Sequence, residues 1–217
     1  MGKKIQKISK IISEEGIFSL FLKVLRYIRK NICGITKAII FELDLEKSFP
    51  RITSELELSF RMAIKKDIDA MDEEHYGYDL KRKQFSKERL EKGDGCVLAL
   101  YNGKIVGYVW TMNDHIDISK FNYIPISKNR ISIYNVFVLK EFRGKRVWNA
   151  FDVYYFDIFR KAKKRFVLCV VDKDNKASIK SRERAGFKRI ENVYQFRFFG
   201  LKHDYIKKKA LLYLQNS

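Results

Sequence analysis

The spacing of apolar residues along the chain predicts a mixture of helices and strands. Residues 17–32 repeat apolar side chains at the three-and-four spacing of an amphipathic helix, and a shorter stretch before Gly16 does the same. Alternating or continuous runs of β-branched and aromatic residues predict strands at 38–45, 57–63, 96–101, 105–112, 131–139, 166–171 and 193–199. Further helices are expected in two pieces within 67–92, from 147 to about 163, in a short segment closed by Gly186, and near the C-terminus.

Two local signals in the middle of the chain are the most specific. Asn102-Gly103 separates two strand-like runs, which is typical of a two-residue hairpin turn. The run 131–139 is almost continuously β-branched and aromatic, which is typical of a strand buried on both faces. The intervening segment 113–129 is polar, and we expect it to be a loop.

The clearest candidate binding site is the turn that follows the strand 131–139. Gly144 lies there between Arg143 and Lys145-Arg146, where a helix is expected to begin. The first N–H groups of a helix have no partner within the helix, so together with nearby cations they favour an anion such as a phosphate. The pattern therefore predicts a phosphate-binding turn within a strand–helix–strand unit.

The N-terminal segment leaves two interpretations open. Its apolar stripe is matched by a basic stripe, formed by Lys23, Arg26 and Lys30. Such a helix packs either on the protein's own core or on an outside surface, which is a partner protein or an anionic membrane, where each Lys or Arg adds roughly 1 kcal/mol. The longest uncharged stretch, Gly16–Leu22, is far shorter than the roughly 18–20 residues of a membrane span.

Composition excludes several classes of protein. The chain has 217 residues, 46% of them hydrophobic and 14% aromatic, which excludes a disordered chain and suits one domain with an appendage. Its three widely spaced cysteines form no disulfide framework and favour a cytoplasmic location. The chain has no nucleophile elbow, P-loop, dinucleotide glycine pattern or close His or Cys pair, so we expect no metal.

The positive charge lies at the two ends of the chain. The formal net charge is +19, with a net +7 in residues 1–40, none in 41–140 and +12 in 141–217. A general preference for lysine accounts for part of this excess. The remainder indicates an anionic partner, which is a lipid surface, a nucleic acid or a phosphorylated cofactor. No recognition helix or RNA-binding motif accompanies the charge, which disfavours nucleic acid.

Four motifs in a fixed order resemble the GNAT (GCN5-related N-acetyltransferase) superfamily. They are Val136-Phe137-Val138, Arg143–Trp148, Asn175–Ile179 and Ala185-Gly186-Phe187, and the resemblance covers about residues 55–200. It implies an α+β fold, with a GNAT-like mixed, mostly antiparallel splayed sheet flanked by helices and preceded here by the N-terminal amphipathic segment. Phe41–Leu45 is similar to a strand that precedes the domain in some members. The expected parts are a basic amphipathic segment (1–37), a strand and linker (38–54), the acyltransferase domain (55–202) and a basic tail helix (203–217).

The resemblance implies that the phosphate turn and its flanks bind acyl-CoA. The residues expected to hold it are Val136, Phe137, Val138, Arg143, Gly144, Lys145, Arg146, Val147, Trp148, Asn175 and Ser178. Arg146 and Trp148 depart from the family pattern, which usually has small residues at these two positions. Their size restricts the approach of the backbone to a ligand, although Arg146 adds a cation.

The resemblance also implies candidates for catalysis and for binding of the acceptor. Strand 131–139 has no Glu where a family base often lies, so the substitutes are Tyr134, Asn135 or the loop pair Asp114/His115. Arg182 falls where the family often has a Tyr that protonates the leaving thiolate; an arginine would instead stabilise the thiolate electrostatically. The candidate contacts to the acceptor are Asp114, His115 and Tyr76, with an exposed loop position as the simpler interpretation of His115.

The implied function is an acyl-CoA-dependent N-acyltransferase. Its donor would be acetyl-CoA or another acyl-CoA, and its acceptor a small amine, for example on a sugar nucleotide or a lipid-linked envelope precursor. The alternative is a non-catalytic GNAT-like module that binds acyl-CoA or an acidic partner. The expected location is the cytoplasm, with residues 1–35 able to hold the protein at the inner face of an anionic membrane.

Deletion of residues 2–35 tests the membrane interpretation. We expect it to abolish cosedimentation with anionic liposomes, because it removes the basic and apolar stripes together, and to leave the 50–202 region folded by circular dichroism. Unchanged liposome binding would show that the segment does not form the membrane contact.

Overall fold

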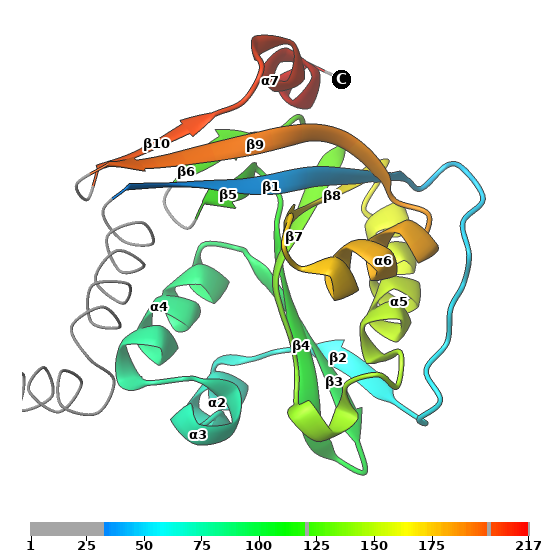
Figure 1. The fold of residues 1–217 in the computed structure, drawn as a ribbon. Helices are drawn as coiled ribbons and strands as arrows, with labels where there is room; N and C mark the ends of the chain where they lie inside the picture. Colours follow the sequence, from blue (N-terminus) through cyan, green and yellow to red (C-terminus); the bar gives the residue numbers. More distant parts are fainter. Residues whose placement is uncertain (1–32, 120–121, 199–200, 217) are drawn as a thin grey trace, which may run out of the picture. The chain divides into compact units, whose positions relative to one another are not determined.

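The computed structural model describes residues 33–119, 122–198 and 201–216 (Figure 1). Two compact units make up the chain: a larger one formed by Ala38–Val193 and Ile206–Ser217, and a smaller one that contains Tyr194–Tyr205 and the residues before Ala38. The amphipathic helices expected at the N-terminus lie outside the described residues. Within the described ranges, no helix is both long enough and apolar enough to span a bilayer.

The secondary structure alternates short strands and helices. The strands are β1 (Cys33–Asp44), β2 (Ser59–Met62), β3 (Gly95–Tyr101), β4 (Lys104–Met112), β5 (His115–Ser119), β6 (Asn122–Pro125), β7 (Arg130–Val138), β8 (Phe166–Asp172), β9 (Lys188–Phe198) and β10 (Leu201–Tyr205). The helices are α2 (Lys65–Ala70), α3 (Glu73–Tyr76), α4 (Leu80–Glu91), the 3-10 turn η1 (Lys140–Phe142), α5 (Val147–Lys161), α6 (Lys176–Arg184) and α7 (Lys208–Gln215).

The strongest sequence signals are confirmed. β3 and β4 pair up to Tyr101 and Lys104, so Asn102-Gly103 forms the predicted two-residue turn. β7, α5 and β8 form the predicted strand–helix–strand unit, and β7 and β8 run parallel. The expected tail helix is present as α7.

The prediction of a loop over residues 113–129 is wrong. Within this segment, β5 and β6 pair as an antiparallel hairpin. Four isoleucines from this region are buried in a cluster with Leu168 of β8: Ile116, Ile118, Ile124 and Ile126. They alternate with polar residues, which is the period of a half-buried strand. The last predicted strand also begins earlier, at Lys188, and β10 crosses the expected boundary at residue 202.

The main sheet is mixed and mostly antiparallel. In the larger unit its strands follow the order β9-β1-β8-β7-β4-β3-β2. β1 pairs antiparallel with β8 from Ala38 opposite Asp172 to Asp44 opposite Phe166. The expected α+β class, with helices flanking a mixed sheet, is confirmed.

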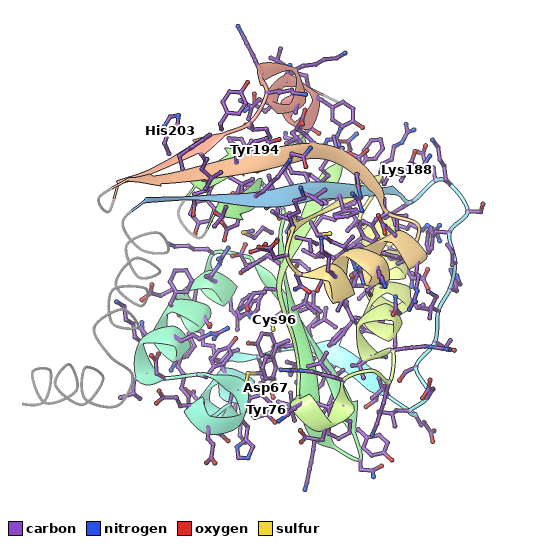
Figure 2. The ribbon with its side chains drawn as sticks, viewed as in Figure 1. Asp67, Tyr76, Cys96, Lys188, Tyr194 and His203 are labelled. Atoms are coloured by element: carbon purple, nitrogen blue, oxygen red, sulfur yellow. The ribbon has the colours of Figure 1, made fainter. Side chains whose placement is uncertain are left out.

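Helices cover both faces of the strands β3, β4 and β7 (Figure 1). On one face, a cluster that includes Val97 and Val109 packs on the apolar side of α5, with Phe151 at its centre. On the other face, Cys96 and Trp110 pack with residues of α2 and the segment before α4 (Figure 2). Apolar side chains therefore occupy both sides of these strands, as the continuous apolar run of β7 predicts.

β7 and β8 separate after four paired residues. Arg130–Ile133 pair with Phe166–Cys169, whereas beyond Ile133 the ladder of β7 continues only with β4. The separation coincides with a register shift opposite Tyr108 and Trp110 and with a left-handed backbone at Asn135 (φ 46°). The edge of β7 that faces away from β4 is therefore available to pair with another extended group.

The smaller unit is a hairpin in its described part. Tyr194–Phe198 of β9 pair antiparallel with Leu201–Tyr205 of β10. The Gln195 amide donates to the Asp204 carboxylate at 3.0 Å, and the Lys37 ammonium lies 4.6 Å from the centroid of the Tyr194 ring.

A buried ion pair joins the two helices that follow β7 and β8. The guanidinium of Arg182 on α6 is fully buried, and its Nη1 and Nη2 lie 2.8 and 2.7 Å from the two carboxylate oxygens of Asp152 on α5. Burial alone disfavours the charged guanidinium, but the Asp152 carboxylate raises the pKa of Arg182 above its ordinary value. The Tyr155 hydroxyl donates to the same carboxylate.

Removing Asp152 should destabilise the protein strongly. Asp152→Ala leaves the Arg182 guanidinium buried without a counter-charge, so we expect the free energy of unfolding to fall by about 3–5 kcal/mol in a urea titration. Glu183→Ala is the matched control, because it breaks an exposed pair with Arg189 and should cost less than about 1 kcal/mol. Equal effects of the two substitutions would contradict a structural role for the buried pair.

Candidate functional site

A cavity of about 430 Å³ lies where the end of β7 meets the starts of α5 and α6. It is lined by backbone and side chains of Val136, Phe137, Val138, Phe142, Arg143, Gly144, Arg146, Val147, Trp148, Asn149, Ala177, Ser178, Ser181 and Arg184. One wall is therefore the separated part of β7, and the other walls are helices. An extended ligand can lie along this strand and end at a helix N-terminus.

The turn before α5 has a backbone suited to binding an anion. Gly144 is left-handed (φ 81°), and Arg146, also left-handed (φ 60°), is the N-cap of α5. The Arg146 side chain caps no N–H group of the helix, so the first N–H groups of α5 keep their capacity to donate to a ligand. A non-glycine residue with positive φ is strained, and such strain occurs preferentially at functional positions.

Most of the cations around the cavity are not neutralised by a carboxylate of a described residue. The Arg143 Nε donates to the Val138 carbonyl at 3.0 Å, and Arg146 lies 3.8 Å from the exposed carboxylate of Glu55. Among the described residues, Arg143, Lys145 and Arg184 form no ion pair with a carboxylate. The cavity therefore has a positive potential that favours phosphate groups.

Two polar side chains at the cavity have buried nitrogens without a hydrogen-bond partner in the described part of the chain. They are the indole Nε1 of Trp148 and the amide Nδ2 of Asn149. Buried donors usually have a partner in the functional state of a protein. Both residues line the cavity, so a bound ligand can supply that partner.

Most of the residues predicted to bind the cofactor meet at this cavity. Val136, Phe137, Val138, Arg143, Gly144, Arg146, Val147, Trp148 and Ser178 all line it. Lys145 and Asn175 do not: the Lys145 ammonium lies over the Phe142 ring, and the Asn175 side chain caps α6 by accepting from the Ser178 N–H at 3.1 Å. The structure thus assigns a capping contact to Asn175, where direct contact with the cofactor was expected.

Sequence reasoning missed five lining residues. They are Phe142, Asn149, Ala177, Ser181 and Arg184. Three of them, with Ser178, follow the three-and-four spacing of one face of α6, which is a signal that the sequence does contain. Asn149 lies in the first turn of α5, where polar residues next to a phosphate turn are candidates for ligand contact.

Arg182 does not occupy the place expected for a catalytic residue. It is absent from the cavity lining, and its guanidinium is engaged by Asp152 and covered by the Trp148 ring at 3.8 Å. A buried, neutralised guanidinium cannot act as a free cation that meets a thiolate. The structure instead makes Arg182 a support for Trp148.

Tyr134 and Asn135 lie at the break in β7, outside the cavity lining. The Tyr134 hydroxyl is buried with no hydrogen-bond partner among the described residues, and burial raises the pKa of Tyr134. The phenol therefore stays protonated at neutral pH and is unsuited to act as a base. Asn135 is exposed, and its side-chain oxygen accepts from Arg82 at 3.1 Å.

The three residues expected to contact an acceptor are not brought together. The Tyr76 hydroxyl donates to the Ile105 carbonyl at 2.7 Å, near the first residues of β4 (Figure 2). The Asp114 carboxylate contacts the His115 ring just beyond the other end of β4, where Met112 pairs with Ser132. Since a strand rises about 3.4 Å per residue, one small acceptor cannot contact both ends of β4.

The described cysteines do not act as nucleophiles at this site. Burial raises the pKa of Cys96, and it raises the pKa of Cys169 to about 12. Both thiols remain protonated at neutral pH and pack as apolar side chains.

Comparison with protein-family models identifies one family. The model of the "Acetyltransferase (GNAT) family" matches residues 52–187, which is more than half of the chain. A search of curated proteins gave no match.

Several solved acetyltransferases have a similar fold. A GCN5-related N-acetyltransferase from Sphaerobacter thermophilus superposes with a TM-score of 0.54 at 17% identity, over 79% of this chain and 54% of that one. A GNAT-family acetyltransferase from Colwellia psychrerythraea gives a TM-score of 0.54 at 12% identity, over 78% and 59%. A glucosamine N-acetyltransferase region of a fungal multi-domain β-N-acetylglucosaminidase gives 0.53 at 11% identity, over 72% and 20%. This chain thus spans little more than half the length of the first two.

Substitution of Gly144 tests whether the turn binds the phosphates of coenzyme A. Gly144→Val places a β-branched side chain in a left-handed turn that borders the cavity, and we expect at least a tenfold loss of coenzyme A affinity by calorimetry. Gly93→Val is the matched control, since Gly93 has a similar backbone (φ 91°) and open surroundings but does not line the cavity. Equal affinity of the Gly144→Val and Gly93→Val variants would contradict a phosphate site at this turn.

Proposed function

The chain belongs to the GNAT acetyltransferase family, and from this premise we propose that it transfers an acetyl group from acetyl-CoA to a small amine. The observation that carries the proposal is the cavity at the end of β7. It combines an unpaired strand edge with a helix N-terminus and with cations that have no ion-pair partner among the described residues. The strand edge suits the pantetheine arm of coenzyme A, and the helix N-terminus and the cations suit the pyrophosphate joined to that arm.

The residues of the cavity fit the two chemically different parts of the cofactor. The separated edge of β7 at Val136–Val138 would pair with the amide groups of the pantetheine arm, as an additional strand would. The N–H groups at the start of α5, with Arg143 and Arg146, would hold the pyrophosphate. Asn149 and Trp148 would supply donors from within the cavity.

The large side chains at two usually small positions do not fill the cavity. The Arg146 side chain is exposed beside Glu55, away from the helix N–H groups. The Trp148 ring lies on the guanidinium of Arg182. A space of about 430 Å³ remains between the turn and α6. The placement of the Arg146 and Trp148 side chains therefore supports binding of the cofactor, although the family usually has small residues there.

Acetyl-CoA, when bound, would supply a thioester whose acyl carbon accepts the amine nitrogen, so that a C–N bond forms, the C–S bond breaks, and the thiolate of coenzyme A leaves and takes up a proton from water. The protein has to position the amine, and the amine has to lose a proton. We propose that water takes this proton, because Tyr134 stays protonated and an amide is not a base. The exposed side chain of Asn135 at the break in β7 would orient the acceptor.

We propose that the acceptor amine belongs to an amino sugar, either on a nucleotide or on a lipid-linked envelope precursor. The basic N-terminal residues 1–35 support a location near an anionic surface, where such precursors occur. One structure with a similar fold is described as a glucosamine N-acetyltransferase region, which is an acceptor of this class. The alternative is a module that binds acyl-CoA or an acidic partner without turnover.

A calorimetric titration with acetyl-CoA at low and moderate salt tests the proposal. We expect micromolar 1:1 binding that persists at moderate salt, because N–H groups of the backbone contribute alongside the cations. A thiol-release assay with a set of amines should then show acetyl transfer. Binding without transfer to any amine would favour the non-catalytic module, and no binding of acetyl-CoA would overturn both acetyl transfer and an acyl-CoA-binding module.

A further inference from the structure

Nearly all arginines with a described side chain are paired with a carboxylate of a described residue. Three are not, and two of these, Arg143 and Arg184, line the cavity. The third is Arg82 on α4, which lies on the other face of the sheet. The paired arginines are Arg51, Arg61, Arg89, Arg130, Arg146, Arg160, Arg165, Arg182 and Arg189.

The guanidinium of Arg82 is held in place by neutral oxygens. Its Nη1 donates to the Gly77 carbonyl at 3.1 Å, and its Nη2 donates to the Tyr108 hydroxyl at 3.0 Å and to the Asn135 side chain at 3.1 Å. The guanidinium also lies 4.7 Å from the centroid of the Tyr78 ring. Arg82 is therefore positioned in advance, and its charge is not neutralised by any of these partners.

Two acids that precede Arg82 in the chain are engaged in caps. Asp79 accepts from the backbone N–H of Arg82 at 2.7 Å and so caps α4. Asp72 caps α3 and contacts the His75 ring. The arrangement leaves a fixed cation next to Asn135, two residues beyond the last residue of β7 that pairs with β8.

Aromatic rings surround this cation on the α4 face. The Tyr108 and Phe137 rings are stacked at 5.2 Å, and Tyr76 lies 6.2 Å from Phe137. Asn135 and Val136 are adjacent in β7, so Arg82 meets the strand one residue before the segment that lines the cavity. A molecule that binds at Arg82 would therefore be close to the end of a ligand that extends along β7.

We propose that Arg82 binds an anionic group, a phosphate or a carboxylate, on the amine acceptor. The inference rests on the proposed acetyl transfer and specifies its acceptor. A guanidinium with neutral partners gains most from an anion, because charge-assisted hydrogen bonds are shorter and stronger than neutral ones. The Nε–H and one Nη1–H of Arg82 have no acceptor among the described residues and can donate to such a group.

The experiment compares matched acceptors that differ in one anionic group. One arm uses glucosamine and glucosamine 6-phosphate, and the other uses an amino acid and its carboxamide. We expect kcat/KM for the anionic member of one arm to exceed that for its neutral partner by at least tenfold. The arm that shows the preference identifies the anion as a phosphate or as a carboxylate.

Two variants and one control separate recognition of the anion from a general effect on the fold. Arg82→Gln is expected to remove the preference through a higher KM for the anionic acceptor, with little change for the neutral one. Asn135→Asp, a residue type tolerated at positive φ, supplies an internal carboxylate to Arg82 and should reduce the same preference without changing Arg82. Lys81→Gln removes an exposed charge from the same helix and should keep the preference.

Two results would overturn the inference while the protein still acetylates amines. They are equal use of the anionic and neutral acceptors, and a preference that persists in Arg82→Gln. Failure to acetylate any acceptor, or absence of acetyl-CoA binding to the unmodified protein, would instead overturn the proposed function, and the inference would fall with it.

Discussion

The shape of the cavity depends on a single buried ion pair. A guanidinium removed from water costs several kcal/mol unless a carboxylate meets it in good geometry, so Arg182 can be buried only where α6 brings it to Asp152 on α5. Trp148 then packs on Arg182 from the first turn of α5, and the next residue, Asn149, is fixed beside it. Because α5 and α6 contribute half of the lining residues, the position of these walls follows from this contact. The fold thus uses a buried ion pair between α5 and α6 to hold Trp148, one of the residues that line the cavity.

The described arginines that have no carboxylate partner indicate where anionic ligands would bind. A net excess of positive charge is visible in the sequence, but the sequence does not show which cations are neutralised within the fold. Among the arginines whose side chains the structure describes, those without a carboxylate partner lie at the cavity and beside Asn135, which precedes the lining residue Val136 in β7. The phosphate groups of an acetyl donor would neutralise the cations at the cavity, and an anionic acceptor would neutralise Arg82.

Structural features that depend only on residues close together in the sequence could be predicted from the sequence. The Asn102-Gly103 hairpin and the glycine and cations of the phosphate turn are local, and the structure places them as expected. The role of Arg182 could not be predicted, since its partner Asp152 lies thirty residues away on another helix. The distance between Tyr76 and His115 likewise follows from the direction of β4, which only the folded sheet establishes. The hairpin of β5 and β6 was missed because its short alternating isoleucines carry a weaker signal than a continuous apolar run.

The position of β1 within the sheet has a consequence for biosynthesis. Its partner β8 follows about 120 residues later in the chain, so β1 leaves the ribosome long before it can pair. During that interval the strand presents Ile40 and Phe41, which are fully buried in the finished sheet, together with two unpaired edges. Such a segment is prone to pair with other chains, and closing so long a loop slows folding. The same strand that completes the sheet therefore makes the nascent chain dependent on protection until β8 has been synthesised.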